Sequence, residues 1–181
     1  MEGKDLQKHV DEFHPNFSCE GSVCSVHSPG PVADDETLAF ILIHPNHYDP
    51  VRDVVTIEAF QELTRRDLST LRSALATKDE AISTRDDLVA RGQQKIPPKE
   101  RMVNEVCTAS VAEIRAQTDG ERRLLGVYDT ALEKVRSHAS IFTRGDVFDD
   151  NLLRKKVRNR IHETFTKNRM PFNKFLDGLR A

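Results

Sequence analysis

The chain is poor in aromatic residues and has no long apolar run. It contains no tryptophan and only two tyrosines, so its nine phenylalanines must supply the aromatic part of the core. Its longest apolar run, residues 38–43, is six residues long, whereas a membrane-spanning helix needs about 20. We therefore expect no membrane-spanning segment and no membrane partner.

Cysteine is also scarce. The three cysteines are an odd number, and the acidic stretch after Met1 lacks the apolar segment of a signal peptide. A disulfide framework is therefore not expected. We expect a cytoplasmic protein.

The sequence lacks the motifs that mark common enzymes and cofactor sites. It has no glycine-rich phosphate loop, no dinucleotide-binding G-x-G-x-x-G, no G-x-S-x-G elbow and no H-E-x-x-H zinc motif. The Cys/His spacing of DNA-reading zinc fingers is missing too. We predict no cofactor, and whether the protein is an enzyme stays open, with the absences favouring a protein without catalysis.

The segments that are present indicate an α+β fold, with a small antiparallel sheet and packed helices. Residues 1–33 end in a stretch rich in Ser, Gly and Pro and are typical of a flexible N-terminal arm. Residues 34–181 are expected to form a single globular domain. Acidic residues that could cap a helix favour a buried helix over 34–43, with a buried strand as the alternative.

Four further elements follow from the patterning between residues 55 and 132. Alternation over 55–59 suggests a strand, and apolar residues among charged ones predict an amphipathic helix near 78–92. Small and β-branched residues over 102–117 favour a strand. After a D-G turn, residues 123–132 alternate and are predicted to be its antiparallel partner.

The C-terminal region has the clearest periodicity. One apolar stripe at four-residue steps predicts an amphipathic helix over 151–167, formed by Leu153, Val157, Ile161 and Phe165. Its other face is basic and includes Arg154, Lys155, Lys156, Arg158 and Arg160. A short second apolar face follows Pro171, with Phe172, Phe175, Leu176 and Leu179 at helical spacing, and it could dock on its own domain or in the groove of a partner.

Two groups of residues have side chains that bind metals. The spacing H-x4-C-x4-C-x2-H brings four soft ligands, which could bind zinc, into one short segment: His14, Cys19, Cys24 and His27. Structural zinc sites usually use tighter C-x2-C pairs, so we expect a plain tail there. The loop after residue 43 carries His44, His47 and Asp49, whose types suit a metal or acid–base chemistry. We expect an ordinary turn with surface histidines and no metal at either place.

Charge is unevenly distributed along the chain. Residues 1–60 carry eleven acids and three bases, while residues 150–181 carry nine bases and three acids. The two ends could pack together and neutralise each other, or the basic end could contact an anionic partner. The net charge of −2 gives no long-range attraction to nucleic acid.

These observations favour a small binding or adaptor protein without catalysis of its own. The partner is expected to be another protein, and an acidic one would suit the basic face. The contact residues are expected to be Arg154, Lys155, Arg158, Phe172, Phe175, Leu176 and Leu179. One alternative is a nucleic-acid-binding protein that uses the basic face of residues 154–169. Another is a metal-assisted hydrolase or transferase that uses the His44/His47/Asp49 loop.

Overall fold

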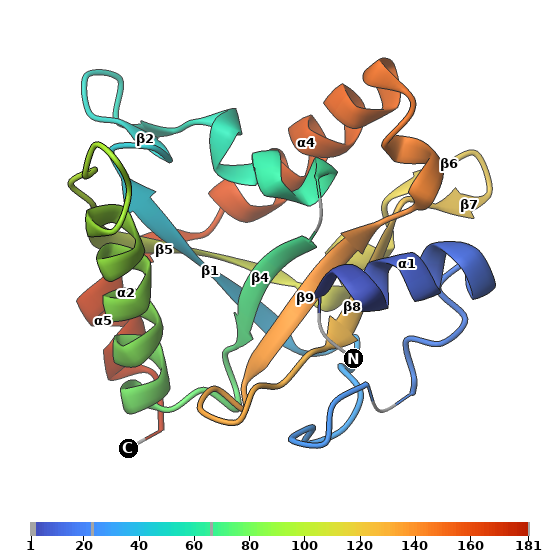
Figure 1. Ribbon diagram of the computed structural model, residues 1–181, viewed down its shortest axis with the longest axis horizontal. Coiled ribbons are helices and arrows are strands. Elements are labelled where there is room, and N and C mark those ends of the chain that lie inside the picture. Colours follow the sequence, from blue (N-terminus) through green and yellow to red (C-terminus); the bar gives the residue numbers. More distant parts are fainter. Residues whose placement is uncertain (1–2, 23, 66, 181) are drawn as a thin grey trace.

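The protein is described from a computed structural model, which covers residues 3–22, 24–65 and 67–180. A six-stranded antiparallel sheet forms its centre, in the order β10-β5-β1-β4-β9-β8 (Figure 1). Those strands are β1 (Thr37–His44), β4 (Asp67–Arg72), β5 (Met102–Ser110), β8 (Leu125–Asp129), β9 (His138–Thr143) and β10 (Arg169–Pro171). Two small hairpins pair β2 (Tyr48–Asp49) with β3 (Val54–Val55), and β6 (Thr118–Asp119) with β7 (Arg122–Arg123). The α+β class with an antiparallel sheet is confirmed.

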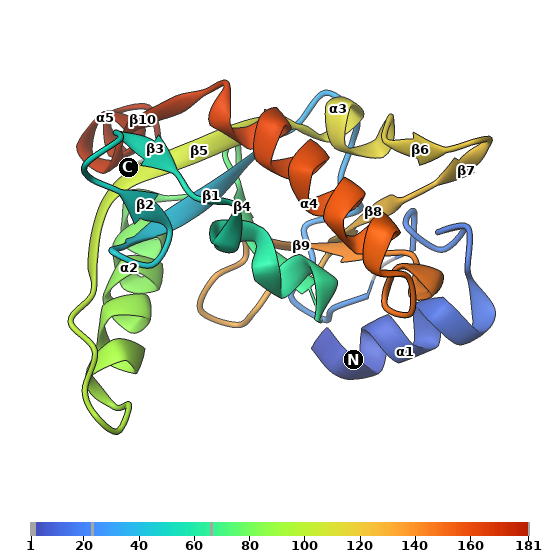
Figure 2. The same cartoon turned by 90° about the horizontal axis from the view of Figure 1, so that it is seen from above.

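Helices pack around this sheet. The α-helices are α1 (Gly3–Phe13), α2 (Lys78–Gln93), α3 (Val111–Arg115), α4 (Asn151–Thr166) and α5 (Phe172–Asp177), and the 3-10 helices are η1 (Ile57–Thr64) and η2 (Gly145–Val147). The largest apolar cluster joins α4 and η1 to one face of the sheet. Smaller clusters place α2 and α5 at one end of the other face and α1 at its opposite end (Figures 1 and 2).

The prediction of a helix over residues 34–43 is wrong, because this segment is the central strand β1. It lies between β5 and β4, and every residue from Leu38 to His44 is buried. A strand covered on both faces needs apolar residues at every position, so it loses the alternation that marks a half-exposed strand. Asp34, one of the acids that suggested a helix cap, instead forms an ion pair with Arg115.

Three other expectations are corrected in part. The predicted strand over 102–117 ends at Ser110, whose hydroxyl caps the short helix α3. Strand β8 exists within 123–132 but pairs with β9 and not with β5, and the D-G turn belongs to the β6–β7 hairpin. Of the strand predicted over 55–59, only Val55 lies in a strand, β3, and the 3-10 helix η1 begins at Ile57.

The two amphipathic helices are confirmed. Helix α2 begins with a capping box in which Thr77 and Glu80 bond reciprocally to each other's backbone amides. Helix α4 begins at Asn151, after the Asp150 carboxylate accepts two amide hydrogen bonds. Its predicted stripe is buried from Leu153 to Phe165. Among the helices in the described part of the chain, none is both long and apolar enough to cross a bilayer.

Within the expected arm of residues 1–33, residues 6–22 and 24–33 pack on the far end of the sheet. Leu6, Val10 and Phe17 are buried against β8 and β9. Phe17 takes the space above Gly126, where a Cβ atom would come within 2.4 Å of its ring. The Glu20 carboxylate accepts from the Val127 amide and so covers the open edge of β8.

Candidate anion-binding site on helix α4

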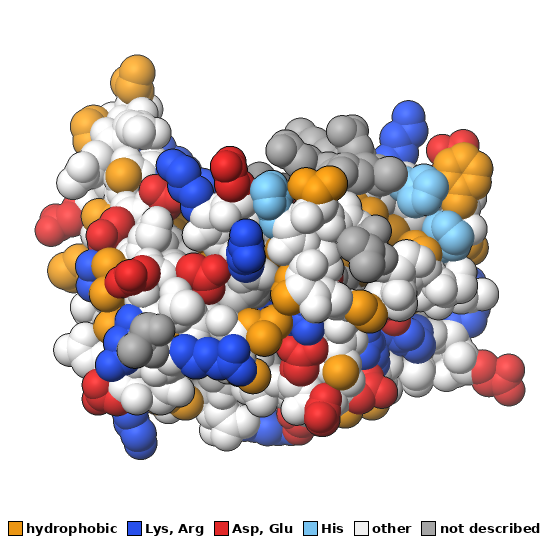
Figure 3. Space-filling model, turned by 90° about the horizontal axis from the view of Figure 1, so that it is seen from below, with side chains coloured by type: hydrophobic (Ala, Val, Ile, Leu, Met, Phe, Trp, Pro, Cys, Tyr) orange, Lys and Arg blue, Asp and Glu red, His pale blue; other side chains and the backbone are white. Residues whose placement is uncertain are grey.

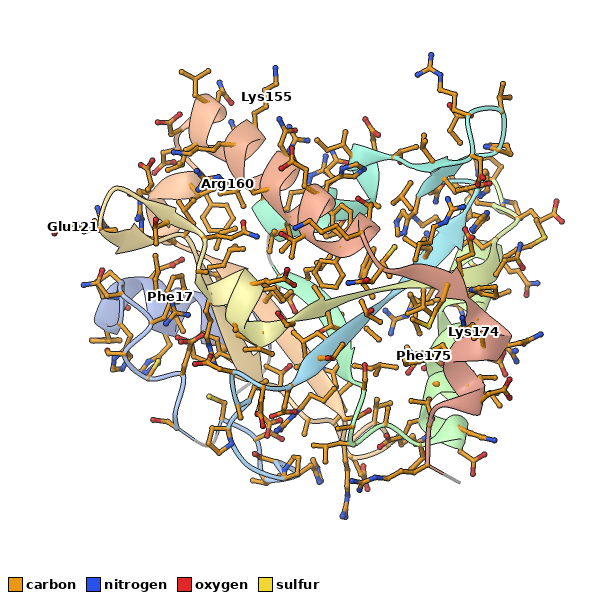
Figure 4. The ribbon with its side chains drawn as sticks, turned by 180° about the vertical axis from the view of Figure 1, so that it is seen from behind. Phe17, Glu121, Lys155, Arg160, Lys174 and Phe175 are labelled. Atoms are coloured by element: carbon orange, nitrogen blue, oxygen red, sulfur yellow. The ribbon has the colours of Figure 1, made fainter. Side chains whose placement is uncertain are left out.

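Helix α4 has one buried stripe and two flanks with different electrostatic surroundings. On the flank toward α3 and β6, each base meets an acceptor. Lys156 pairs with Asp119, Arg160 donates to the Thr118 carbonyl, and Lys167 lies 4.0 Å from a Glu113 oxygen. Figure 4 shows Arg160 on this flank. The positive charge here is therefore balanced by groups of the same chain.

The opposite flank, toward η1, borders a pocket of about 250 Å³. Its lining comprises three guanidinium groups, two carboxamides and one hydroxyl, from Gln61, Thr64, Arg65, Asn151, Arg154 and Arg158. No carboxylate is among these lining residues. Because one wall comes from the 3-10 helix and the other from α4, the pocket depends on the packing of η1 against α4 through Phe60 and Phe165.

Arg158 is the least satisfied residue of the pocket. Its Nε atom is buried without a hydrogen-bond partner, and no hydrogen bond or ion pair joins its side chain to another residue in the described ranges. The Nε atoms of Arg101 and Arg123 are also unpartnered, but other nitrogens of those two guanidinium groups donate to protein oxygens. Arg158 therefore differs from them in lacking any acceptor among the residues that the structure describes.

The other bases nearby are also available to a ligand. Arg154 donates to the Asn151 side chain, which is a neutral acceptor. Lys155 is exposed and projects from α4 away from the body of the molecule (Figure 4). Arg65 is exposed, and its side chain has no ion pair with a described residue. On the side away from α4, by contrast, acidic and basic side chains are interspersed (Figure 3).

This arrangement suits an anion with several oxygen atoms. A guanidinium group is planar, stays charged and presents N–H groups in a fork that matches carboxylate or phosphate oxygens. Like charges that share a pocket repel each other, and a buried N–H without an acceptor costs free energy. An anionic ligand would remove both penalties at once.

The apolar half of the expected contact surface is not available. Phe172, Phe175 and Leu179 are buried, and Leu176 packs against the same cluster between α5, α2 and the sheet. Figure 4 shows Phe175 on the inner side of α5. The Arg85 guanidinium of α2 lies 5.6 Å from the Phe172 ring centroid. The tail therefore folds back on its own domain, because its phenylalanines are needed to cover the sheet.

The histidine loop does not bring its three candidate side chains together. His47 stacks on Phe40, its Nδ1 accepts from the Ile43 amide, and burial lowers its pKa to about 4, so it is neutral at pH 7. Asp49 accepts from the amides of Val51 and Arg52, as in an ordinary turn.

His44 instead lies near residues that are distant from it in the sequence. Its Nε2 lies 3.6 Å from a Glu105 oxygen, and neither of these two atoms has a hydrogen-bond partner in the described part of the chain. Burial lowers the pKa of His44, against the opposing effect of Glu105. Arg169 bridges Glu105 and Asp53, which also accepts from the Tyr48 hydroxyl. Sequence spacing could not reveal this group, because its members come from β1, β2, β5 and β10.

The possible zinc ligands each have other neighbours. His14 contacts the Ser18 hydroxyl, Cys19 contacts the Tyr128 hydroxyl at 3.3 Å, and Cys24 donates to the Ser22 carbonyl. The fourth, His27, lies at a turn. Among the residues that the structure describes, no group of three or more His, Cys, Asp or Glu side chains could hold a metal ion.

Sequence reasoning found two of the three pocket arginines. Arg154 and Arg158 stand out because they lie opposite the apolar stripe of α4. Arg65 was missed, since its position beside α4 depends on how η1 packs. A base immediately after an apolar helix segment, as in the sequence from 57 to 65, was the only available signal.

Comparison of the chain with protein-family models, with curated proteins and with solved structures finds no match in any of the three. Function must therefore be inferred from the chemistry of the pocket.

Proposed function

We propose that this is a non-catalytic binding protein of the cytosol, which docks an acidic segment of a partner protein in the arginine pocket of α4. One observation carries the proposal. Arg65, Arg154 and Arg158 line one pocket without a carboxylate, and Arg158 has no acceptor among the described residues. An acidic segment would supply the oxygens that this pocket lacks.

The other flank of α4 supports this interpretation. There the chain provides Asp119 and Glu113 for its own bases. On the η1 flank none of the residues that line the pocket is an acid, although the two flanks belong to one helix. A set of charges that folding leaves unbalanced is expected where a ligand provides the balance.

An acidic protein segment fits the pocket better than nucleic acid does. A nucleic-acid surface usually follows the phosphate backbone as an extended basic track. Here two bases of the second flank pair with acids and Arg160 donates to a carbonyl oxygen, so the charge of this flank is less available than that of the pocket. The net charge of −2 also gives no long-range attraction to a polyanion.

We propose no catalytic function for the histidine loop. His47 is committed to a backbone amide and Asp49 to a turn, so neither is free to assist His44. General acid–base chemistry needs its groups within hydrogen-bond reach of one substrate atom.

A binding assay with two labelled polyanions tests the proposal. Fluorescence anisotropy would compare a glutamate-rich peptide with a DNA duplex, on the wild-type protein and on the Arg154→Gln/Arg158→Gln variant. We expect the peptide to bind and the double variant to lose most of this binding. Lys156→Gln/Lys167→Gln is the matched control, because it removes two charges from the other flank of the same helix. Peptide binding that depends equally on both flanks would contradict a pocket-specific site.

A further inference from the structure

We propose that the acid recognised by the arginine pocket is a phosphate monoester, carried by a phosphorylated serine or threonine of the partner. This inference rests on the proposed function and makes it more specific. It turns docking at α4 into a contact that depends on phosphorylation. Three observations about the pocket support it: its charge, the source of its donors and the unpaired state of Arg158.

The charge of the pocket exceeds what one carboxylate can balance. Three guanidinium groups line it, and no lining residue carries a negative charge. A carboxylate brings one negative charge and two oxygens. A phosphate monoester brings about 1.5 to 2 negative charges at pH 7 and three strong acceptor oxygens. The monoester therefore matches three cations more closely than a glutamate or aspartate does.

The donors of the pocket come from side chains and not from the helix end. Phosphate often binds at helix N-termini, where free backbone amides point outward. At the start of α4, however, the Asp150 carboxylate already accepts from the amides of Leu152 and Leu153. Binding must therefore depend on guanidinium forks, with the Gln61 and Asn151 amides as additional donors. Clusters of arginine are a general means of recognising phosphorylated residues.

The unpaired state of Arg158 fits a ligand that is present only at times. A permanent structural role would leave the Arg158 guanidinium paired with an acid of the chain, as Arg72 is paired with Glu36. Instead Arg158 lines the pocket, and its buried Nε has no hydrogen-bond partner among the described residues. A phosphoryl group that is added and removed would alternately satisfy and release this donor.

Nucleic acid offers the wrong kind of phosphate for this pocket. A phosphodiester has one negative charge and two non-bridging oxygens, and its affinity comes from many contacts along a strand. The pocket concentrates three cations around about 250 Å³. It is therefore suited to one doubly charged group and not to a series of singly charged ones.

Titration with small probes tests the inference on the full chain. The probes are serine, phosphoserine and glutamate, each capped as the N-acetyl methylamide, together with inorganic phosphate, dimethyl phosphate and a DNA duplex. Amide NMR shifts of the wild-type protein, Arg158→Gln and Lys167→Gln would give the affinities, and thermal melts would confirm that each variant is folded. Lys167→Gln removes one charge from the other flank of α4.

We expect capped phosphoserine to bind at least about tenfold more tightly than capped glutamate, and capped serine not to bind. Arg158→Gln should weaken phosphoserine binding by about tenfold or more, the size expected for a charged hydrogen bond. Lys167→Gln should change it by less than about twofold, because exposed charges away from the pocket are screened.

The pH dependence distinguishes the monoester from other acids. The second pKa of a phosphate monoester is about 6, so phosphoserine binding should weaken between pH 7.5 and pH 5. Dimethyl phosphate keeps one charge over this range and controls for titration of the protein. The charged side chains near the pocket include Glu58 and Glu62 on η1, and Asp149 and Asp150 before α4. Any effect of their titration on binding should appear equally in the dimethyl phosphate control.

The possible outcomes separate the two proposals. If glutamate binds as tightly as phosphoserine, and Arg158→Gln weakens both, the monoester inference is overturned while the acidic-partner function stands. If inorganic phosphate binds more tightly than capped phosphoserine, the site takes a free anion, and the phosphoprotein inference fails. If no acidic probe binds, or if Arg158→Gln has no effect, both proposals fail. Binding of the duplex alone, with a steep salt dependence, would favour the nucleic-acid alternative instead.

Discussion

Two arginines, Arg72 and Arg158, show how differently one side chain can be used within this fold. The Arg72 guanidinium is buried and donates to Glu36, to Asp129 and to two loop carbonyls. Arg158 lines an open pocket, has a buried Nε, and has no acceptor among the described residues. The first group holds the loop before β1 onto the sheet. The Arg158 guanidinium makes no hydrogen bond or ion pair with a described residue.

The difference separates a structural role from a functional one. A buried cation whose donors are all satisfied is maintained by folding, and the loss of its partner is strongly destabilising. A cation that shares its pocket with two others and no acid is not maintained by folding. The comparison predicts that substitutions near Arg72 will change stability, whereas substitutions in the pocket will change binding.

The largest effect is expected at Asp129. Its carboxylate is fully buried, and Asp129→Ala would leave the Arg72 charge with one partner fewer in a buried place. We expect a loss of about 3–5 kcal/mol in the free energy of unfolding, measured with urea. Asp129→Asn keeps the shape and an acceptor oxygen, so it should cost less. A loss below about 1 kcal/mol in both variants would show that the ion pairs of Arg72 contribute little to the stability of the fold.

A second effect follows from pH. The pKa of His47 is lowered by burial to about 4, whereas an unfolded histidine titrates near 6.5. Between these two values the unfolded chain binds more protons than the folded one, so stability should fall as the pH decreases from about 6.5 to 4. His47→Asn keeps an acceptor for the Ile43 amide but does not titrate.

The measurement compares slopes and not absolute stabilities, because the variant also loses ring packing on Phe40. Urea unfolding at several pH values should give a shallower dependence for His47→Asn than for the wild type. Equal slopes would show that folding does not lower the pKa of His47. This would weaken the conclusion that the loop histidines have structural surroundings.

A smaller effect is expected on the balanced flank of α4. Lys156 and Asp119 are paired, but their side chains are about 40% exposed. Lys156→Gln should therefore change stability little. The pKa of Asp119 is lowered chiefly by its hydrogen bond from Lys156, so it should rise toward its usual value in the variant. An NMR titration of the Asp119 carboxyl carbon checks this, and an unchanged pKa would show that the pair does not persist in solution.

The sequence allowed the helices to be predicted better than the sheet. The four-residue spacing from Leu153 to Phe165 is a local signal, and the helix that it predicted is confirmed. β1 was missed because burial on both faces removes alternation. The partner of β8 was missed because strand pairing is set by contacts between distant segments, which no local pattern encodes.

In the candidate site, too, some features follow from local spacing and others depend on packing between distant segments. Arg154 and Arg158 follow from helical spacing, since they lie opposite the buried stripe. The contribution of Arg65 and the absence of acids from the pocket depend on the packing of η1 beside α4. The docking of Phe172 and Phe175 on α2 was equally hidden from local patterns. The charge was visible in the sequence, but its division into balanced and unbalanced flanks was not.

The smallest expected change, at Arg158, tests the comparison most directly. Arg158→Gln removes a charge from a pocket that also contains Arg65 and Arg154, and it breaks no hydrogen bond or ion pair to a described residue. We expect the free energy of unfolding to stay within about 0.5 kcal/mol of the wild type, with any change toward higher stability. Such a gain should shrink in high salt, because it arises from reduced repulsion that salt screens. Urea unfolding at low and high ionic strength measures both quantities, with Lys167→Gln as the control for the loss of one charge. A loss above about 1 kcal/mol would show that Arg158 supports the fold as Arg72 does, and the case for a ligand in the pocket would then lose its main observation.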